Sequence, residues 1–253
     1  MYQFSEEELG RYSRHLLLKE VGREGQEKIH DGRALLIGCG GLGSPIAMYL
    51  AAAGIGTLGL IDGDEVDASN LQRQVIHHTA DVGIAKVESA KRKVNSINPH
   101  VNAVAIRDFL TADNAADIIA DYDFVIDGTD RYATKYLIND ACVKAGKPFS
   151  HGGVLRFQGN AFTYVPGSAC YRCIFGEQPS QDDIPVSAQV GIMGTVAGLI
   201  GIVQATETLK FFTGAGELLT DHLLTFDALT WEFHKVKVGK APHCPVCGTA
   251  SPR

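Results

Sequence analysis

Residues 34–43 read Ala-Leu-Leu-Ile-Gly-Cys-Gly-Gly-Leu-Gly, a short apolar run that ends in a G-x-G-x-x-G turn. The apolar run predicts a buried strand, and the small, mostly apolar residues 44–53 predict a helix packed closely on a sheet. A second apolar run, residues 57–61, is followed at once by Asp62. Strand, glycine turn, helix, strand and acidic residue in this order are typical of a nucleotide-binding unit in an α/β sheet.

Each part of this unit suits a phosphate-bearing ligand. The helix after the turn presents free N–H groups and a partial positive charge at its N-terminus. Asp62 comes about 20 residues after the last glycine, where its carboxylate can accept hydrogen bonds from ribose hydroxyls. The glycines, which permit a tight bend and close approach of a phosphate, are Gly38, Gly40, Gly41 and Gly43.

The residues after the unit separate two kinds of nucleotide. The glycine turn alone would indicate NAD, so an NAD-dependent oxidoreductase is one alternative. Residues 62–74 read Asp-Gly-Asp-Glu-Val-Asp-Ala-Ser-Asn-Leu-Gln-Arg-Gln, and Lys86 follows twelve positions later. Two cations suit a triphosphate, whose charge must be held and whose leaving pyrophosphate must be stabilised. Arg73 and Lys86 are therefore candidate phosphate ligands, although an arbitrary Arg and Lys would be surface cations.

Taken together, these motifs resemble the MoeB/ThiF/HesA family, relatives of ubiquitin-activating enzymes. The resemblance runs from Arg11-Tyr12-Ser13-Arg14 to Cys244-Pro245-Val246-Cys247. It implies an ATP-dependent adenylyltransferase that converts the C-terminal glycine of a ubiquitin-like sulfur carrier, a small protein ending in Gly-Gly, into an acyl-adenylate. Thiamin and molybdopterin pathways use near-identical machinery, so the carrier stays open. A non-catalytic adaptor that binds a carrier protein is a second alternative.

The resemblance also implies roles for particular residues. Asp130, in the loop after the predicted strand 122–127, is expected to hold catalytic Mg²⁺, which prefers oxygen ligands. Its alternative is to cap the predicted helix 131–145. Arg14 is expected to reach the ATP phosphates of the partner subunit in a homodimer, and it joins Arg73, Lys86 and Asp130 as a catalytic candidate. Besides the four glycines, the expected nucleotide contacts are Asp62, Asp64, Ser69, Asn70, Leu71, Gln72, Arg73, Lys86, Asp130 and Arg131.

The chain departs from the family pattern beside Asp130. Asn usually follows the Thr-Asp pair, but this chain has Arg131, and Lys135 stands where Arg is common four residues later. A cation therefore neighbours the residue expected to hold the metal. Arg131 either contacts a phosphate or points to solvent, and the sequence leaves both open.

Four of the six cysteines form two C-x-x-C pairs, Cys170/Cys173 and Cys244/Cys247. Four thiolates close a tetrahedral zinc shell and leave no position for substrate, so the pairs predict a structural zinc site. A disulfide within each pair is the alternative, which the absence of an export signal disfavours. Cys39 and Cys142 stand alone and are expected to be buried.

Some members of the family carry a nucleophilic cysteine after the first C-x-x-C pair. Residues 177–189 contain none, and Ser187 lies about where that cysteine would be expected. A serine hydroxyl is a weak nucleophile without an activating base, so we expect the reaction to stop at the acyl-adenylate. No rhodanese-like extension follows Arg253, and a separate sulfur donor is therefore expected.

Composition limits the partners and the compartment. The chain has 253 residues and a net charge of −6, which argues against broad nucleic-acid binding. Its acidic, polar N-terminus is not a secretory signal, so a cytoplasmic protein is expected. The apolar stretch 190–203 is too short for a bilayer, which needs ~20 apolar residues. It is expected to form a buried, glycine-rich helix with no membrane contact, and the family resemblance implies that its surface suits a homodimer interface.

The alternation of strands and helices predicts an α/β fold with a Rossmann-like, doubly wound and mostly parallel sheet, extended by antiparallel strands. A helix from Glu6 is expected to carry Arg14, with Gly22 and Gly25 breaking the pattern after it. Residues 81–97 are expected to form another helix. One adenylation domain is expected over residues 1–253, made of an N-terminal helical segment 1–30, a nucleotide-binding core 31–152, and a sheet extension 153–253 with the zinc site and a carrier-binding surface.

Overall fold

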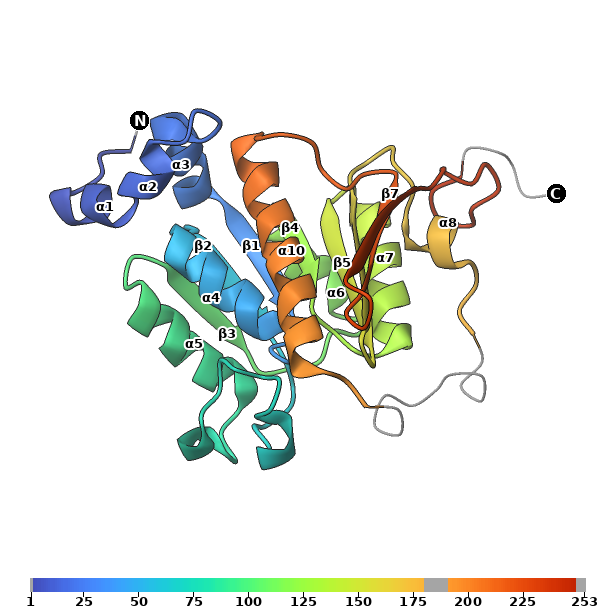
Figure 1. The fold of residues 1–253 in the computed structure, drawn as a ribbon, viewed down its shortest axis with the longest axis horizontal. Coiled ribbons are helices and arrows are strands. Elements are labelled where there is room, and N and C mark those ends of the chain that lie inside the picture. Colours follow the sequence, from blue (N-terminus) through green and yellow to red (C-terminus); the bar gives the residue numbers. More distant parts are fainter. Residues whose placement is uncertain (1, 180–190, 249–253) are drawn as a thin grey trace.

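The computed structural model describes residues 2–179 and 191–248, which form an eight-stranded sheet with the order β3-β2-β1-β4-β5-β6-β7-β8 (Figure 1). The pairs from β3 to β5 are parallel, and the pairs from β5 to β8 are antiparallel. This confirms the predicted α/β sheet with an antiparallel extension. The strands are β1 (Arg33–Ile37), β2 (Thr57–Ile61), β3 (Asn102–Ile106), β4 (Phe124–Asp127), β5 (Phe149–Leu155), β6 (Gln158–Tyr164), β7 (His222–Asp227) and β8 (Glu232–Lys237).

Helices cover both faces of this sheet, because successive residues of a strand point to opposite faces and both sets are apolar in the central strands. Leu36 of β1 faces a core shared with α4, α5 and α10, whereas Leu35 faces a second core shared with α6, α7 and α8. Figure 1 shows the first group of helices on one face and α6 and α7 on the other. The helices are α1 (Glu6–Arg11), α2 (Ser13–Leu16), α3 (Gly22–Asp31), α4 (Gly43–Ala53), α5 (Lys86–Ile97), α6 (Ala115–Ala120), α7 (Tyr132–Ala145), α8 (Tyr171–Phe175) and α10 (Gly194–Thr213).

The N-terminal helices differ from the prediction. Ser5 and Glu8 form a capping box at α1, but the helix stops at Tyr12, and Arg14 lies on the separate four-residue α2. Of the two glycines expected to break the pattern, Gly22 lies at the break with a φ of +56° and begins α3, whereas Gly25 lies within α3. A Cβ on Gly25 would come close to side chains of Val21 and Thr213. Close packing against α10 therefore favours glycine there, although glycine has a low helix propensity.

Two further helix boundaries differ from the prediction. The helix expected over 81–97 begins at Lys86, since residues 79–81 form a separate 3₁₀ turn. The helix expected over 190–203 is α10, which begins at Gly194 and continues through Gln204 and Glu207 to Thr213. Both of these polar side chains are buried and hydrogen-bonded: Gln204 donates to the Asp127 carbonyl at 2.8 Å, and Glu207 accepts from the Thr163 hydroxyl at 2.7 Å. In the described parts of the chain, none of the helices has the length and apolar character needed to cross a bilayer.

Candidate nucleotide-binding site

Two loops meet where the strand order reverses, between β1 and β4. The glycine turn follows β1, and the loop Gly128-Thr129-Asp130 follows β4. Gly128 donates its N–H to the Ile37 carbonyl at 2.9 Å, and a Cβ on Gly38, whose φ is +93°, would lie 2.9 Å from the Gly128 carbonyl oxygen. Ligands of open α/β sheets bind in the crevice at this kind of switch point. The absence of side chains at Gly38 and Gly128 thus lets the two loops touch there.

The glycine turn is held from both sides by side chains. Asp62 Oδ2 accepts the Cys39 N–H at 2.8 Å, and Asp62 Oδ1 accepts the Asp64 N–H at 2.9 Å. On the other side, Nε2 of the buried His77 lies 2.9 Å from the Cys39 carbonyl oxygen. A Cβ on Gly43 would collide with the Gly38 carbonyl, so the first residue of α4 must be glycine. The turn is therefore held in place at the N-terminus of α4, where free backbone N–H groups suit a phosphate.

The two predicted phosphate cations both lie near this turn. Lys86 is the buried first residue of α5, and its Nζ lies 2.9 Å from Asp64 Oδ2. Arg73 donates to Asn70 Oδ1 at 3.0 Å, and its side chain packs beside Gly41. The structure thus links both cations to other predicted nucleotide contacts.

The rest of the turn 69–74 contains one polar atom that suits a ligand. Gln74 Oε1 is buried and has no hydrogen-bond partner among the described residues, while Gln74 Nε2 lies beside Gly40. A buried acceptor without a partner is unfavourable, so it fits a site that a polar ligand completes. Ser69 bonds Asp67 through both its N–H and its hydroxyl, Leu71 is half-buried, and Gln72 is exposed.

Asp130 is exposed and forms no hydrogen bond or ion pair with another described residue. The alternative that it caps α7 is wrong, because Arg131 occupies the N-cap position. The Arg131 guanidinium lies 5.7 Å from the centre of the Phe109 ring, and that ring covers Gly63, next to Asp62. Arg131 therefore packs on an aromatic side chain beside the glycine turn and the Asp130 loop. We call the edge of the sheet where these two loops meet the nucleotide edge.

Arg14 is not part of this cluster within one chain. It is exposed on α2, and its neighbour Tyr12 accepts a hydrogen bond from Asn98 at 2.8 Å, just before β3 begins. The N-terminal helices thus lie at the amino ends of the strands, away from the segment 62–86 (Figure 1). A role for Arg14 at phosphates requires a second copy of the chain.

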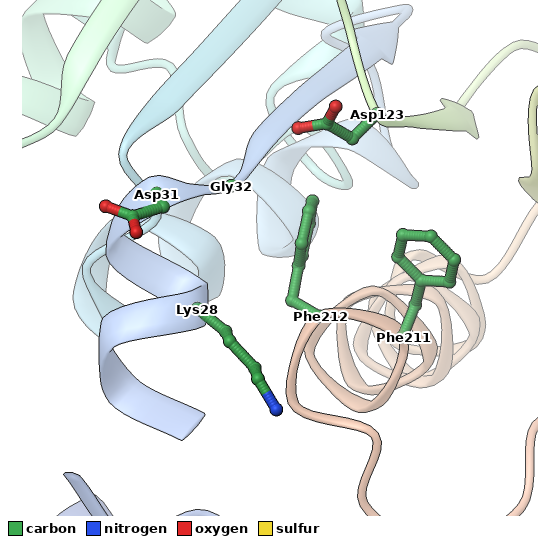
Figure 2. Close-up of a pocket in the computed structure, with 6 residues that line it drawn as sticks. All are labelled: Lys28, Asp31, Gly32, Asp123, Phe211 and Phe212. Atoms are coloured by element: carbon green, nitrogen blue, oxygen red, sulfur yellow. The ribbon is translucent and has the colours of Figure 1, made fainter. Parts of the chain in front are cut away.

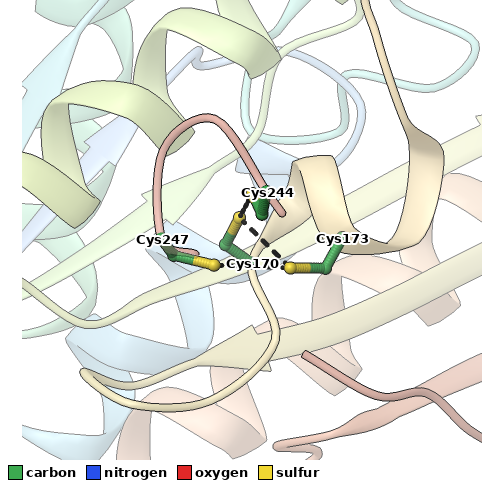
Figure 3. A group of neighbouring side chains, drawn as sticks. All are labelled: Cys170, Cys173, Cys244 and Cys247. Carbon is green, nitrogen blue, oxygen red and sulfur yellow. Dashed lines mark hydrogen bonds between the residues drawn. The ribbon is translucent and has the colours of Figure 1, made fainter. Parts of the chain in front are cut away.

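The four predicted metal ligands come together at the end of the antiparallel extension (Figure 3). Their sulfurs all lie within 4.8 Å of one another, with Cys170 Sγ 3.6 Å from Cys244 Sγ and Cys173 Sγ 3.3 Å from Cys247 Sγ. Tetrahedral zinc with Zn–S bonds of about 2.3 Å places sulfurs ~3.8 Å apart. The Ala241 N–H also points at Cys173 Sγ, at 3.3 Å, as it would toward a thiolate. The cluster fits a zinc ion, and all four cysteines are free thiols, so the disulfide alternative is wrong.

The two remaining cysteines are buried, as predicted. Cys39 is 1% exposed in the glycine turn, and Cys142 is fully buried on α7. Burial raises the pKa of both thiols well above the ordinary value. Neither is therefore an accessible thiolate. Ser187 and most of the stretch 177–189 lie outside the described residues.

A cavity of about 400 Å³ lies at the amino ends of the strands, opposite the carboxyl ends that carry the glycine turn (Figure 2). Gly32 and Asp123 line it just before β1 and β4 begin, and Phe211 and Phe212 reach it from the end of α10. Because the glycine turn and Asp130 follow the carboxyl ends of the same strands, this cavity is separate from the nucleotide edge.

Sequence reasoning missed the charged cluster beneath the Asp130 loop. Asp127, Lys135 and His151 are all buried there and contact one another through Asp127. One signal was present in the sequence: Asp127 ends the otherwise apolar run Phe-Val-Ile. A charge in a buried strand needs a partner, but the sequence does not say which of many cations provides it.

A doubly wound sheet with a glycine turn at its switch point defines the class of nucleotide-binding α/β proteins. Within this class, the chain belongs to the ThiF family, whose family model matches residues 12–246. It is 43% identical over 241 residues to the SAMP-activating enzyme E1 of Haloferax volcanii, covering 95% of this chain and 89% of the relative. It is 40% identical over 252 residues to a sulfur carrier protein adenylyltransferase of Thermus thermophilus, covering 97% and 93%.

A solved structure shows the same architecture. The crystal structure of E. coli MccB with ATP superimposes with a TM-score of 0.82 at 25% sequence identity, covering 94% of this chain and 73% of that chain. The predicted family and fold class are thereby confirmed.

Proposed function

We propose that this chain is an ATP-dependent adenylyltransferase acting on a ubiquitin-like sulfur carrier. A carboxylate oxygen of the carrier's C-terminal glycine forms a bond to the α-phosphorus of ATP, the bond to the β-phosphate breaks, and pyrophosphate leaves. The observation that carries the proposal is the contact between the glycine turn and the Asp130 loop at the switch point. The name of the Thermus thermophilus relative, sulfur carrier protein adenylyltransferase, supports the choice of substrate.

The reaction needs no general base, because a C-terminal carboxylate is already ionised near neutral pH. The protein must instead hold two anionic reactants together and neutralise developing charge. The glycine turn would cradle a phosphate, while Arg73 and Lys86 would hold the others. Asp62, which already accepts two backbone N–H groups, would accept ribose hydroxyls with its remaining lone pairs. Asn70, which lies against Arg73, would line the nucleotide with Ser69, Leu71 and Gln72.

Two metals belong to this proposal. Asp130 would hold Mg²⁺, which neutralises phosphate charge, because a protein site for this ion commonly offers one or two carboxylates and leaves the rest to phosphates and water. The cysteine cluster would hold structural Zn²⁺. Four thiolates would close the tetrahedral shell and leave no position for substrate, which supports a structural role rather than a catalytic one.

The partners and compartment follow from the same assignment. The active form would be a cytoplasmic homodimer, in which Arg14 of one chain reaches the phosphates of the other. The absence of a cysteine from residues 177–189 and the burial of Cys39 and Cys142 support an enzyme that stops at the acyl-adenylate. A separate sulfur donor would then complete the sulfur transfer.

Isotope exchange between pyrophosphate and ATP tests the function directly. With Mg²⁺ and a small carrier ending in Gly-Gly, the protein should exchange label, and mass spectrometry should detect the carrier acyl-adenylate. NAD should neither bind nor replace ATP. Binding of a carrier without any exchange would support the non-catalytic adaptor instead.

A further inference from the structure

Asp127 connects the end of β4 to the loop that carries Asp130. Its Oδ1 accepts two hydrogen bonds from Thr129, one from the backbone N–H at 3.1 Å and one from the hydroxyl at 2.7 Å. Its Oδ2 accepts from Lys135 Nζ at 3.0 Å and from His151 Nδ1 at 2.8 Å. Four donors thus occupy the acceptor sites of an ionised carboxylate, which has about four.

The charges in this cluster balance below the surface. Asp127 is 1% exposed and Lys135 is 7% exposed. Burial alone would raise the pKa of Asp127, but the charge of Lys135 and the hydrogen bonds from His151 and Thr129 hold that pKa well below its usual value. Burial and the nearby Lys135 lower the pKa of His151, so its ring is neutral with Nδ1–H directed at Asp127. Lys135 is therefore the cation that balances Asp127.

The same lysine also fixes the chain on the far side of Asp130. Its backbone N–H donates to the Arg131 carbonyl at 3.1 Å in the first turn of α7, and its Nζ donates to the Gly152 carbonyl of β5 at 2.7 Å. The backbone is thus held at Thr129, one residue before Asp130, and at Arg131, one residue after it. Asp130 itself is exposed between these two fixed points.

We propose that Asp127 and Lys135 are positioning residues that aim the Asp130 carboxylate into the crevice beside the glycine turn. Both side chains are buried beneath the loop and act through the backbone of residues 128–131. This inference rests on the proposed function of Asp130. It also explains why lysine is acceptable at position 135. Asp127 needs one buried positive charge beside it, and the lysine supplies this charge while donating to Asp127 and to the Gly152 carbonyl.

The first test uses the protein without ligand, so that it does not depend on catalysis. In Lys135→Met, amide hydrogen exchange at Thr129 should accelerate at least tenfold relative to wild type, and Lys135→Arg should restore slow exchange. Thr129→Val removes a single hydroxyl bond at a half-exposed residue, which keeps the test valid if Lys135→Met does not fold. Exchange at the residue 129 amide should accelerate in this variant and remain slow in Thr129→Ser.

The second test measures metal binding and turnover. Electron paramagnetic resonance of Mn²⁺ with ATP should show at least tenfold weaker Mn²⁺ binding in Lys135→Met and near wild-type binding in Lys135→Arg. Pyrophosphate exchange should fall in kcat by about 10²-fold, the usual scale for misplacing a reacting group by about 1 Å. The KM for carrier should stay unchanged, because Asp127 and Lys135 are both buried beneath the loop.

Asp140→Asn is the matched control. It breaks the ion pair between Asp140 of the same helix and Arg172 of α8, which are 2.7 Å apart, without touching the loop. Equal losses in Lys135→Met and Asp140→Asn would indicate general destabilisation and overturn the proposal, as would wild-type Thr129 exchange and Mn²⁺ affinity in folded Lys135→Met. In a further outcome, amide hydrogen exchange at Thr129 responds as expected while no carrier supports pyrophosphate–ATP exchange in the wild type. That result would refute the proposed function but would leave the positioning of the loop by Asp127 and Lys135 intact.

Discussion

The nucleotide edge and the cysteine cluster differ in what brings their segments together. At the nucleotide edge, each loop follows its own strand, and the loops meet because β1 and β4 are neighbours in the sheet. The cysteine cluster joins the start of α8 to a turn after β8 (Figure 3). Its two C-x-x-C pairs follow β6 and β8, which end at the same edge but are separated by β7. Neighbouring strands therefore bring the two nucleotide loops together, whereas the two cysteine pairs meet through their own sulfur atoms.

This difference decides which region depends on a bound ion. At the nucleotide edge, protein groups balance one another, as Lys86 does with Asp64. Burial raises the pKa of Cys170 to about 11 and also raises the pKa of Cys247. At Cys244, burial is outweighed by backbone N–H groups of the same C-x-x-C segment, which lower its pKa to about 7. Four thiolates within a few ångströms would repel one another, so all four cysteines can ionise together only if a cation balances them. The fold around the nucleotide edge should therefore persist without ligand, whereas the cysteine cluster should not persist without metal.

The two regions are nevertheless connected through His151. Its ring centre lies 4.8 Å from that of Tyr171 and 5.7 Å from that of Phe175, both on the helix of the first cysteine pair. Its Nδ1 contacts Asp127. Four predictions use this comparison, beginning with the change expected to have the largest effect.

Replacing Asp130 should stop chemistry without unfolding the protein. Because Asp130 is exposed, Asp130→Ala should leave the free energy of unfolding nearly unchanged while pyrophosphate exchange falls by more than about 10³-fold, beyond the loss of one preorganised donor. Urea unfolding and isotope exchange measure the two quantities. Undiminished exchange in this variant would show that Asp130 is not the metal ligand.

Removing one cation at the nucleotide edge should have a smaller effect. Arg73→Ala and Lys86→Met should each slow exchange by about 10²–10³-fold, the range for loss of one charge-stabilising group. Arg92→Ala is the matched control, because Arg92 lies on the same helix as Lys86. This substitution removes an ion pair between the exposed Arg92 and Asp81. Similar rates for Arg92→Ala and Lys86→Met would contradict the assignment.

Breaking the cysteine cluster should lower stability first. Freshly isolated protein should contain one Zn²⁺ per chain, and Cys244→Ser should lower the free energy of unfolding by more than about 4 kcal/mol, a loss typical of a removed structural metal. Metal analysis and urea unfolding check both values. Cys142→Ser, which alters a buried cysteine outside the cluster, should keep its zinc. Folded wild-type protein without zinc would refute the site.

The smallest effect concerns the pH dependence of stability. Burial lowers the pKa of His77, although its contact with the Cys39 carbonyl opposes this, so the native state binds fewer protons than the unfolded state below the ordinary histidine pKa of about 6.5. Stability is therefore full above about pH 6.5 and declines as pH falls, with a slope of at most ~1.4 kcal/mol per pH unit per proton. His77→Gln should show a shallower slope in unfolding at pH 5–7. An unchanged slope would mean that His77 is not a neutral buried group.

Some of these features are set by neighbouring residues in the sequence. The glycine turn, the acidic residue after the next strand and the C-x-x-C spacing each require particular residue types close together in the chain, so the nucleotide-binding class and the cysteine cluster could be predicted. The α/β sheet and its antiparallel extension followed from strand and helix periodicity. The family resemblance supplied the expected roles of Asp130, Arg73 and Lys86.

Other features depend on contacts between distant segments. Gly25 lies within α3, where Thr213 of α10 leaves little room for a side chain. This contact exists only in the folded chain, so the sequence alone did not predict a glycine inside a helix. Lys135 became the partner of Asp127 only when β4, β5 and α7 packed together. A buried charge is acceptable only where three-dimensional packing supplies its counter-charge and hydrogen bonds, and local sequence does not encode that packing. The sequence by itself therefore determined the chemical groups of this protein, whereas tertiary structure decided which of them hold one another in place.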